Sequence, residues 1–512
     1  MAPFVVHYFL LFSTLIVVPS LLNVSGVTAF AAQQSHPFPK SSHTPLLAEK
    51  SRRMTGVPNV LVRLRGGGGV APPSSSSSTR LRVGASAASP SASDADPAAK
   101  FKKMRISAFD SMRFILIMAI VCGHFIQFAN PSEFIRRLAS NHNVLVGAFF
   151  ALSGYVTAYT STENAKMEPS QKLVHTPKQK WILSRVFGYY PLHLLVLVLF
   201  SPLFLFVDLH YNGWSTALIN GILSVTMTQA WFPMNAEIWN APTWFLSSLT
   251  FATAIMPFCL PSIAYMNKME LRKTGFWIFM VYVLPKIGYA YDLNTWQLAE
   301  GVMISAKAHP NLAIFNMQRF SPLFVVAEVL LGVIACRFVM LDHAPGEETR
   351  LRATNSLSTA VPLATMMGLL WMRATGMLEL SDLLFRSVLF VPLFLRFLIA
   401  IHRNTVQRNG SGSSGGGSKD PLVTILSNEV LVTLGKDLSF PIYLLHGPIG
   451  YLFFKKLVAK QLWGHVLKGP TYFAAYLAVT ILSALVLQKT FLQSKTVHNW
   501  SQQTVETLSA WM

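Results

Sequence analysis

From residue 106 onward, this chain is a succession of apolar segments, each long enough to cross a lipid bilayer. A bilayer core about 30 Å thick is crossed by about 20 residues of α-helix. Because lipid offers the backbone no hydrogen-bond partners, a spanning segment must be a helix or part of a closed barrel. We therefore predict an all-α, polytopic membrane helix bundle with about ten transmembrane helices. The predicted spans are 106–128, 143–161, 182–206, 243–264, 274–292, 320–341, 357–374, 383–402, 431–454 and 470–490.

The composition is typical of a membrane protein and gives no reason to expect a nucleic-acid partner. Hydrophobic residues make up 52% of the chain and charged residues only 12%, whereas soluble proteins carry roughly 25% charged residues. The net charge of +20 fits lysine and arginine gathered in loops on the inner side of a bilayer. The three cysteines lie in apolar runs, so we expect neither a disulfide framework nor a metal site.

A further apolar run, 215–233, determines the topology of everything that follows it. This run is shorter and more polar than the ten segments above. If it crosses the membrane, the basic loop at 268–273 lies outside. If it is re-entrant or lies in a cavity, that loop and most of the later basic loops lie inside. Ten full spans therefore fit the positive-inside rule better than eleven.

The regions outside the spans have distinct compositions. Residues 1–30 are predicted to be a signal peptide or signal anchor, and residues 31–104 a disordered stretch rich in Ser, Gly and Arg that is similar to a transit peptide. Residues 105–495 form the membrane domain, with a flexible Gly/Ser loop at 408–420 and a C-terminal tail at 496–512. We expect a multi-pass protein of the endomembrane system, with a plastid membrane as the alternative.

The first predicted span carries three ionisable side chains, Asp110, Arg113 and His124. Such groups are costly in lipid, and they face protein, a cavity or a substrate. Arg113 and His124 are eleven residues apart, about three helical turns, so they share one helix face with Asp110 close to it. Because imidazole titrates near neutral pH, a histidine here could act as a general base toward a hydroxyl nucleophile. The alternative is a hydrogen bond between helices.

Two residues of the next spans have both a chemical and a structural interpretation. Ser153 could be a nucleophile, but no base is near it in the sequence, which favours packing or a hydroxyl that lines a cavity. Arg185 could bind the phosphates of a cofactor through paired hydrogen bonds. Alternatively, it could be an interfacial arginine whose charged end reaches the lipid headgroups.

Later spans carry a second set of polar side chains. Glu328 lies in an apolar helix and must be protonated or paired, with Arg319 as the candidate partner. Ser439, Tyr443 and His446 lie at i, i+4 and i+7, on one helix face. His446 is either a residue on the substrate side or a buried structural histidine.

Taken in order, these motifs resemble the integral-membrane acyltransferase 3 family, whose members include bacterial polysaccharide O-acetyltransferases. The similarity runs from about residue 106 to residue 490, and the ordered set is more specific than any single motif. The matching motifs are Phe109-Asp110-Ser111-Met112-Arg113, Gly123-His124-Phe125, Phe149-Phe150 with Leu152-Ser153-Gly154-Tyr155, Arg185 with Tyr190-Pro191, Trp244-Phe245-Leu246-Ser247, Arg319-Phe320 with Glu328 and Gly332, and Leu434-Gly435 with Ser439, Tyr443 and His446.

The resemblance implies an O-acyltransferase that moves an acyl group, usually acetyl from acetyl-CoA, to a hydroxyl of a sugar, glycan or lipid acceptor. Acyl-CoA would be a co-substrate, with no bound cofactor and no metal. The family pattern assigns catalysis to His124 and Arg113, and donor binding to Arg185. The family's second arginine falls on Gly188 here, and the glutamate that commonly follows Trp244 in bacterial members is absent. The candidates for the substrate cavity are Asp110, Ser153, Trp244, Glu328, Tyr443 and His446.

On this reading, His124 deprotonates the acceptor hydroxyl as it attacks the thioester, while Arg113 orients the histidine or stabilises charge on the carbonyl oxygen. The helical rise places His124 about 16 Å beyond Arg113. We therefore expect the donor to enter from the inner face and the acceptor from the outer side. The alternatives are a proton-coupled transporter of a small acid or lipid, with His124 and Glu328 as proton relays, and a catalytically weak family member, which Gly188 suggests.

Overall fold

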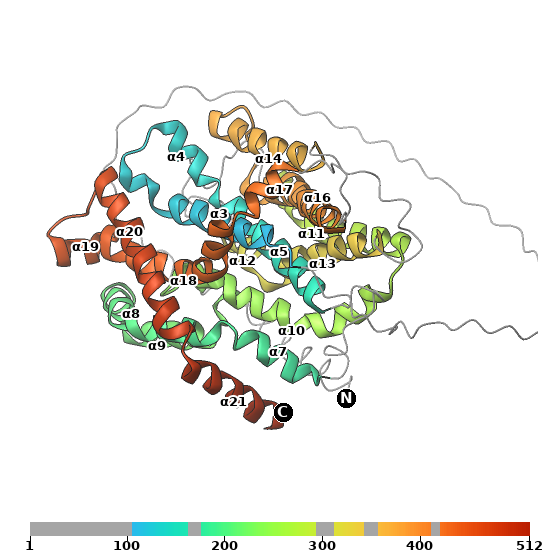
Figure 1. Cartoon of the computed structure of the whole chain (residues 1–512). Helices are drawn as coiled ribbons and strands as arrows, with labels where there is room; N and C mark the ends of the chain where they lie inside the picture. The colour runs from blue at the N-terminus through green and yellow to red at the C-terminus, as the bar shows by residue number, and fades with distance from the viewer. Residues whose placement is uncertain (1–104, 162–175, 293–311, 343–356, 411–419, 512) are drawn as a thin grey trace, which may run out of the picture. The chain divides into compact units, whose positions relative to one another are not determined.

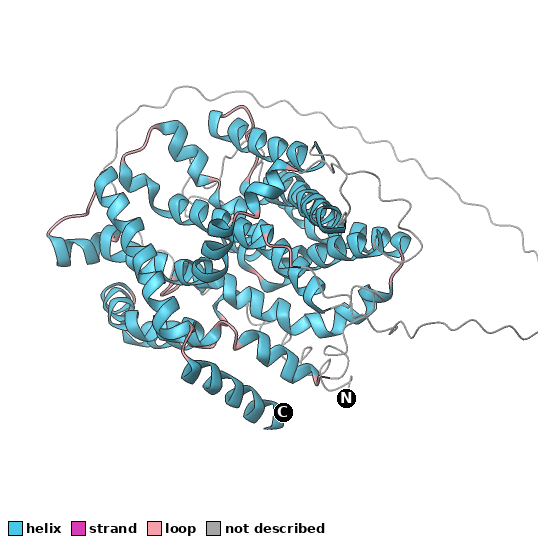
Figure 2. Ribbon diagram, in the orientation of Figure 1, coloured by secondary structure: helices cyan, strands magenta, loops and turns pink. Residues whose placement is uncertain are grey.

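The computed structural model describes residues 105–161, 176–292, 312–342, 357–410 and 420–511. The chain divides into two units, Met1–Ala99 and Lys100–Met512, and every described residue belongs to the second. The described residues are mostly helical and contain no strand (Figures 1 and 2), which confirms the predicted fold class. The predicted signal, transit-like and Gly/Ser-loop segments lie wholly or largely outside the described residues; these are 1–30, 31–104 and 408–420.

Seven helical stretches within the described residues are long and apolar enough to cross a membrane. They coincide with seven of the ten predicted spans. In chain order they are α3 (Ala108–Phe125) with η2 (Ile126–Ala129), α4 (Glu133–Ser140) with α5 (His142–Ser161), α8 (Tyr190–Tyr211), η5 (Ala241–Thr243) with α10 (Trp244–Tyr265), α12 (Leu312–Phe320) with α13 (Pro322–Asp342), α15 (Asp382–Leu384) with η9 (Phe385–Phe390) and α16 (Val391–Gly410), and α20 (Pro470–Leu487) with η10 (Gln488–Leu492).

The other three predicted spans also fold as long helices. They are α11 (Lys268–Asp292), α14 (Leu357–Thr375) and α18 (Glu429–Phe454), with 25, 19 and 26 residues. Each is long enough to cross a bilayer, but each is less apolar than the seven stretches above. Part of the difference comes from polar side chains that these helices bury inside the protein.

The run 215–233 does not form a spanning helix. Helix α9 (Gly213–Val225) has 13 residues and is therefore about 20 Å long, well short of the bilayer core. Two single turns follow it, η3 (Gln229–Trp231) and η4 (Pro233–Asn235). Irregular backbone is tolerated at membrane depth where protein covers it. Within the described residues, the structure thus agrees with ten predicted spans that form long helices and with a run 215–233 that does not.

Four shorter helices complete the described part of the chain. Helix α7 (Lys178–Val186) is separate from α8, so the predicted span 182–206 begins later than expected, at Tyr190. Most of the expected C-terminal tail is helical and forms α21 (Lys495–Trp511), which packs against α7 (Figure 1). The remaining two are α17 (Pro421–Leu426) and α19 (Lys456–Trp463).

Glycine residues allow the central helices to approach closely. The most extensive helix contacts are those of α5 with α13 and of α3 with α18. Lipid tails are as apolar as leucine side chains, so close van der Waals packing must hold such helices together. A Cβ atom added at Gly154, Gly332 or Gly435 would collide with a backbone carbonyl group of the facing helix. At these points one backbone rests directly on another.

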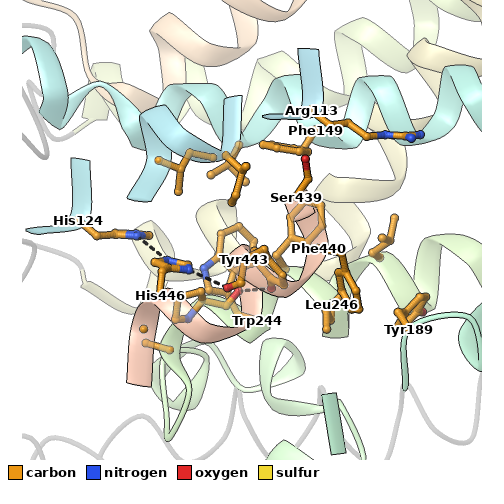
Figure 3. A pocket seen from close by; sticks show the side chains of 18 of the residues that line it. Arg113, His124, Phe149, Tyr189, Trp244, Leu246, Ser439, Phe440, Tyr443 and His446 are labelled. Carbon is orange, nitrogen blue, oxygen red and sulfur yellow. Dashed lines mark hydrogen bonds between the residues drawn. The ribbon is translucent and has the colours of Figure 1, made fainter. Parts of the chain in front are cut away.

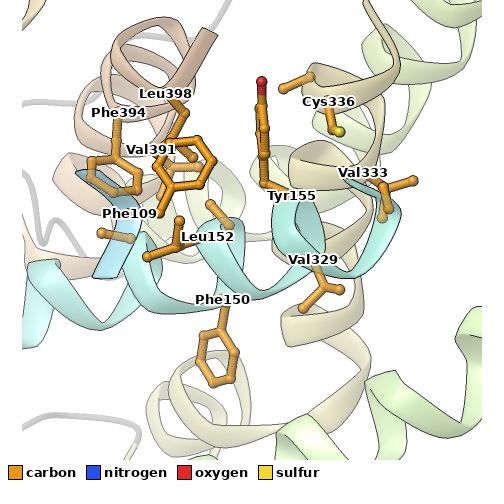
Figure 4. Packing of buried hydrophobic residues seen from close by; sticks show 14 of the residues in the cluster. Phe109, Phe150, Leu152, Tyr155, Val329, Val333, Cys336, Val391, Phe394 and Leu398 are labelled. Carbon is orange, nitrogen blue, oxygen red and sulfur yellow. The ribbon is translucent and has the colours of Figure 1, made fainter. Parts of the chain in front are cut away.

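Buried aromatic and aliphatic side chains fill the space around the α5–α13 contact (Figure 4). The ring of Tyr155 in α5 stands edge-on to Phe109 in α3, with 5.3 Å between the ring centroids. The Tyr155 hydroxyl is hydrogen-bonded to Nδ1 of His402 in α16 at 2.7 Å. Cys336 of α13 is fully buried in the same cluster, as its apolar surroundings in the sequence predict. Three helices are thereby joined to α13.

Substitution of Gly332 by alanine tests the close contact of α5 with α13. We expect Gly332→Ala to lower the free energy of unfolding, because the added methyl group meets a backbone carbonyl that cannot swing aside. Overpacking costs about 1–3 kcal/mol, so the thermal unfolding midpoint should fall by several degrees. Gly368→Ala in α14 is the matched control, because no described atom lies within 4 Å of the added Cβ there. Equal midpoints for the two variants would contradict the packing described.

Candidate functional site

A cavity of about 750 Å³ lies among helices α3, α5, α10 and α18 (Figure 3). Its size is within the range of small-molecule and cofactor sites, roughly 300–1,000 Å³. The cavity gathers side chains that are far apart in the sequence. Seven of the predicted site residues line it: Arg113, His124, Ser153, Arg185, Trp244, Tyr443 and His446.

Two histidines form a hydrogen-bonded pair at one end of the cavity. Nδ1 of His124 lies 3.0 Å from Nε2 of His446, and Nδ1 of His446 lies 2.7 Å from the carbonyl oxygen of Tyr443. A carbonyl oxygen only accepts, so His446 donates from Nδ1, and its neutral ring presents a lone pair on Nε2. His124 then donates from Nδ1 to that lone pair. This assignment leaves Nε2 of a neutral His124 as a proton acceptor.

The helix that carries His446 is fixed by the segment before Trp244. Pro448 has no N–H group, so it cannot donate to the carbonyl of Leu444 one helical turn earlier. Asn240 supplies the missing donor, with its Nδ2 atom 2.9 Å from the Leu444 oxygen. The Tyr443 hydroxyl donates in the other direction, to the carbonyl oxygen of Pro242 at 2.7 Å. These two bonds hold α18 and the 240–243 turn together beside the histidine pair.

Arg113 lines the cavity at a distance from the histidine pair. Its Nη1 atom donates to Oδ1 of Asp110 at 2.9 Å, and Arg105 donates to the other carboxylate oxygen at 2.7 Å. Asp110 therefore holds Arg113 but is not itself part of the cavity lining. The rise of α3 separates Arg113 from His124 by about 16 Å, and Figure 3 shows the two apart. The prediction that Arg113 orients His124 is wrong, because His446 is the partner of that ring.

Two more basic side chains line the same cavity. Arg185 contacts the Thr160 hydroxyl at 3.2 Å and lies over the Trp181 ring, and burial lowers the pKa of its guanidinium. Lys436 of α18 was missed in the sequence, although its position three residues before Ser439 places it near the predicted polar face. Gly188, which stands where the family carries a second arginine, also lines the cavity.

Ser153 lines the cavity with its hydroxyl directed back to its own helix. Its Oγ atom donates to the carbonyl oxygen of Phe149 at 2.7 Å. This is the usual i−4 bond of serine in a helix and occupies the hydroxyl proton. The described contacts show no base beside Ser153, so they favour the lining role over a nucleophilic one.

Asn143, Glu237 and Arg319 form another polar group in the cavity lining, which the sequence did not predict as a site. Nη2 of Arg319 donates to Oδ1 of Asn143 at 3.0 Å and lies 3.6 Å from a Glu237 carboxylate oxygen. Asn143 follows His142, whose ring lies 4.5 Å from that of His124 between centroids, so Arg319 lies near the histidine end of the cavity. The sequence analysis singled out Arg319 only for its place in the matched motif and as the expected partner of Glu328.

Glu328 lies outside the cavity lining and pairs with a different arginine from the one expected. It is 1% exposed, it accepts hydrogen bonds from Arg386 and Tyr282, and its Oε1 atom lies 2.7 Å from Nε of Arg386. The prediction that Arg319 pairs with Glu328 is therefore wrong. Arg386 lies in the π-helical stretch η9, where the extra residue per turn changes the direction of the side chains.

Comparison with known families identifies the class of protein. The family model of the acyltransferase 3 family, described as an acyltransferase domain, matches residues 106–489. Because this match covers most of the chain, the protein belongs to the acyltransferase 3 family and is a membrane acyltransferase. Comparisons with curated proteins and with solved structures gave no significant match.

Glu328→Gln tests whether the buried ion pair is structural. The substitution leaves Arg386 without a counter-charge in the protein interior. Removal of one partner from a buried pair costs about 3–5 kcal/mol, so we expect a large fall in the thermal unfolding midpoint of the purified protein. Glu133→Gln on the exposed surface of α4 is the control, because surface ion pairs contribute little to stability. Similar midpoints for both variants would contradict a structural role of Glu328.

Proposed function

We propose that this protein transfers an acyl group, acetyl as the first choice, from acyl-CoA to a hydroxyl group of a sugar, glycan or lipid. The observation that carries this proposal is the His124–His446 pair, which opens onto the same cavity as Arg113 and Arg185. One end of the cavity offers a base for a hydroxyl group. The other offers guanidinium groups that match phosphates.

The donor would lie along the cavity with its phosphates at the basic end. Arg113, Arg185 and Lys436 supply positive charge there. The extended pantetheine arm of a coenzyme A thioester then reaches toward His124, about 16 Å farther along α3. The acceptor would approach the histidine pair from the opposite side of the membrane. Holding both reactants in one cavity converts a bimolecular encounter into an oriented reaction.

The proposed reaction proceeds through a tetrahedral intermediate. The acceptor oxygen attacks the carbonyl carbon of the thioester, its proton moves to Nε2 of His124, and the π electrons of the carbonyl move onto oxygen. Collapse of the intermediate re-forms the carbonyl, breaks the carbon–sulfur bond, and returns the proton to the departing thiolate. Throughout, His446 accepts the Nδ1–H hydrogen bond of His124 and stabilises the charged ring, as the third member of a catalytic triad does.

The position of Glu328 disfavours a proton relay of the kind a transporter would use. Glu328 is paired with Arg386 and does not line the cavity that contains His124. The two groups proposed for a relay are thus not brought to one cavity. Counterflow of labelled acceptor into liposomes without acyl-CoA would instead favour transport.

We also propose residence in a membrane of the endomembrane system, with a plastid membrane as the alternative. The support is the apolar stretch within residues 1–30 and the Ser- and Arg-rich stretch that follows it at 31–104.

Substitution of the histidine pair tests the proposed catalysis. We expect His124→Ala to abolish acyl transfer, and His446→Ala to lower kcat by about 10²–10⁴-fold, because the base loses the partner that fixes its tautomer. The assay uses purified protein in lipid nanodiscs, labelled acetyl-CoA, and methyl glucoside or a monoglycosyl diacylglycerol as acceptor. His498→Ala, on exposed α21, is the control. Transfer at the wild-type rate by His124→Ala would exclude this mechanism.

Arg185→Gln tests the phosphate-binding end. Loss of a charge-assisted hydrogen bond of about 1.5–3 kcal/mol should raise the KM for acetyl-CoA by roughly 10–100-fold. The KM for S-acetyl-N-acetylcysteamine, a thioester without phosphates, should not respond. Lys180→Gln is the matched control, since this lysine lies on the same helix, pairs with Glu506 and does not line the cavity. An equal effect on both thioesters would argue against phosphate recognition by Arg185.

A further inference from the structure

We propose that Arg319 binds the oxyanion that forms on the acyl carbonyl, and that a chain made of Asn143 and the buried pair Asp382 and Arg373 positions it. This inference rests on the proposed acyl transfer. It assigns to Arg319 the electrostatic role that the sequence suggested for Arg113.

Arg319 is placed to contact a substrate. It is the penultimate residue of α12, its side chain is 19% exposed, and it lines the cavity that contains His124. The guanidinium lies over the ring of Phe320, with 4.6 Å to the ring centroid. Among the described residues, its polar contacts are the bond to Asn143 and the 3.6 Å approach to the half-exposed Glu237. A guanidinium has several N–H donors in one plane, so others remain for a ligand.

A chain of hydrogen bonds behind Arg319 sets its position. Nδ2 of Asn143 donates to Oδ2 of Asp382 at 3.0 Å, which turns the amide oxygen of Asn143 toward Arg319. Arg373, whose side chain is 1% exposed, donates to Oδ1 of Asp382 at 2.6 Å and to Asn141 at 2.5 Å. These hydrogen bonds connect α12 to α5, α5 to α15, and α15 to α14. The bond from Arg373 to Asn141 then fixes α14 beside the start of α5. Arg319 is therefore held in place before any substrate enters.

The alternative cation, Arg113, is poorly placed for this role. It is separated from His124 by about 16 Å of helix. Arg319 instead is hydrogen-bonded to Asn143, the residue after His142, and the His142 ring lies 4.5 Å from the His124 ring between centroids. Negative charge develops on the carbonyl oxygen while the acceptor proton moves to His124, so the stabilising donor must lie at the histidine end of the cavity. Preorganised donors of this kind account for a large part of catalysis.

During the proposed transfer, Arg319 forms one hydrogen bond to the substrate and then loses it. As the acceptor oxygen bonds to the carbonyl carbon, the carbonyl π electrons move onto oxygen, and Arg319 donates an N–H group to that anion. When those electrons re-form the carbonyl, the carbon–sulfur bond breaks and the thiolate leaves with the proton from His124. The hydrogen bond from Arg319 weakens again as the charge disappears.

Arg319→Gln and Arg319→Lys test the inference. Two rates are measured in nanodiscs: single-turnover transfer from acetyl-CoA to saturating methyl glucoside, and hydrolysis of acetyl-CoA by water without acceptor. We expect Arg319→Gln to lower both rates by about 10²–10³-fold, the effect of removing one oxyanion donor. Arg319→Lys keeps the charge without the planar fork and should fall between Gln and wild type. Affinity for acetyl-CoA should change little in either variant.

Controls separate this role from structure and from acceptor binding. Arg136→Gln on the exposed face of α4 removes a surface arginine and should leave both rates intact. Slower transfer with normal hydrolysis in Arg319→Gln would assign Arg319 to acceptor binding and overturn the inference. Wild-type rates in a folded Arg319→Gln protein would also overturn it. If Arg319→Gln fails to fold, Arg319→Lys decides, and wild-type rates for that variant count against an oxyanion role that needs the guanidinium fork.

Failure of the proposed function would look different. A wild-type protein that binds acetyl-CoA but neither hydrolyses nor transfers the acetyl group would remove the proposed function and the inference with it. An active wild type with an equally active Arg319→Gln protein would remove only the inference.

Discussion

Direct contact between helix backbones sets the geometry of the whole site. Gly435 of α18 rests on the carbonyl group of Asp110 in α3. From that point both helices run in the same direction, α18 toward His446 and α3 toward His124. There Nδ1 of His124 lies 3.0 Å from Nε2 of His446. In lipid, where apolar surfaces gain little from leaving the solvent, such close packing is the main force between helices. A bulkier residue at Gly435 would therefore disturb the histidine pair more than ten residues away.

Two buried charge networks serve different purposes in this fold. Glu328 and Arg386 neutralise each other in the interior, and Lys286 lies beside them with its Nζ atom 2.7 Å from the Ser387 hydroxyl. That network joins α11, α13 and η9 away from the cavity. The second network begins at Arg373 and ends at the cavity wall. Ionisable groups are rare in membrane interiors because each must be paired. Of these two networks, only the one that begins at Arg373 reaches the cavity.

The sequence predicted the helices well because their signal is local. An apolar run of spanning length is visible in the chain itself, so all ten predicted spans fold as helices, and seven of the predicted site residues line one cavity. Partner choice could not be predicted in the same way. The sequence showed that Glu328 needs a partner. The choice of Arg386 over Arg319 depends on a π-helical stretch, which the residue pattern does not predict. Likewise, the distance between Arg113 and His124 follows from the helical rise alone. The position of Arg319 in the cavity that contains His124 depends on how α12 packs.

The eleven-residue interval between Arg113 and His124 lets helix α3 fix the spacing between the basic end of the cavity and the histidine pair. A helix is stiff along its axis, so the helical rise between Arg113 and His124 is set at about 16 Å by α3 itself and does not depend on flexible loops. For a donor bound with its phosphates at the Arg113 end, as proposed, a much shorter arm would leave the thioester short of the histidine pair. Discrimination among acyl donors would then depend on the length of the arm more than on the shape of the acyl group. A single inserted residue in this interval would turn His124 by about 100° around the axis and away from the cavity.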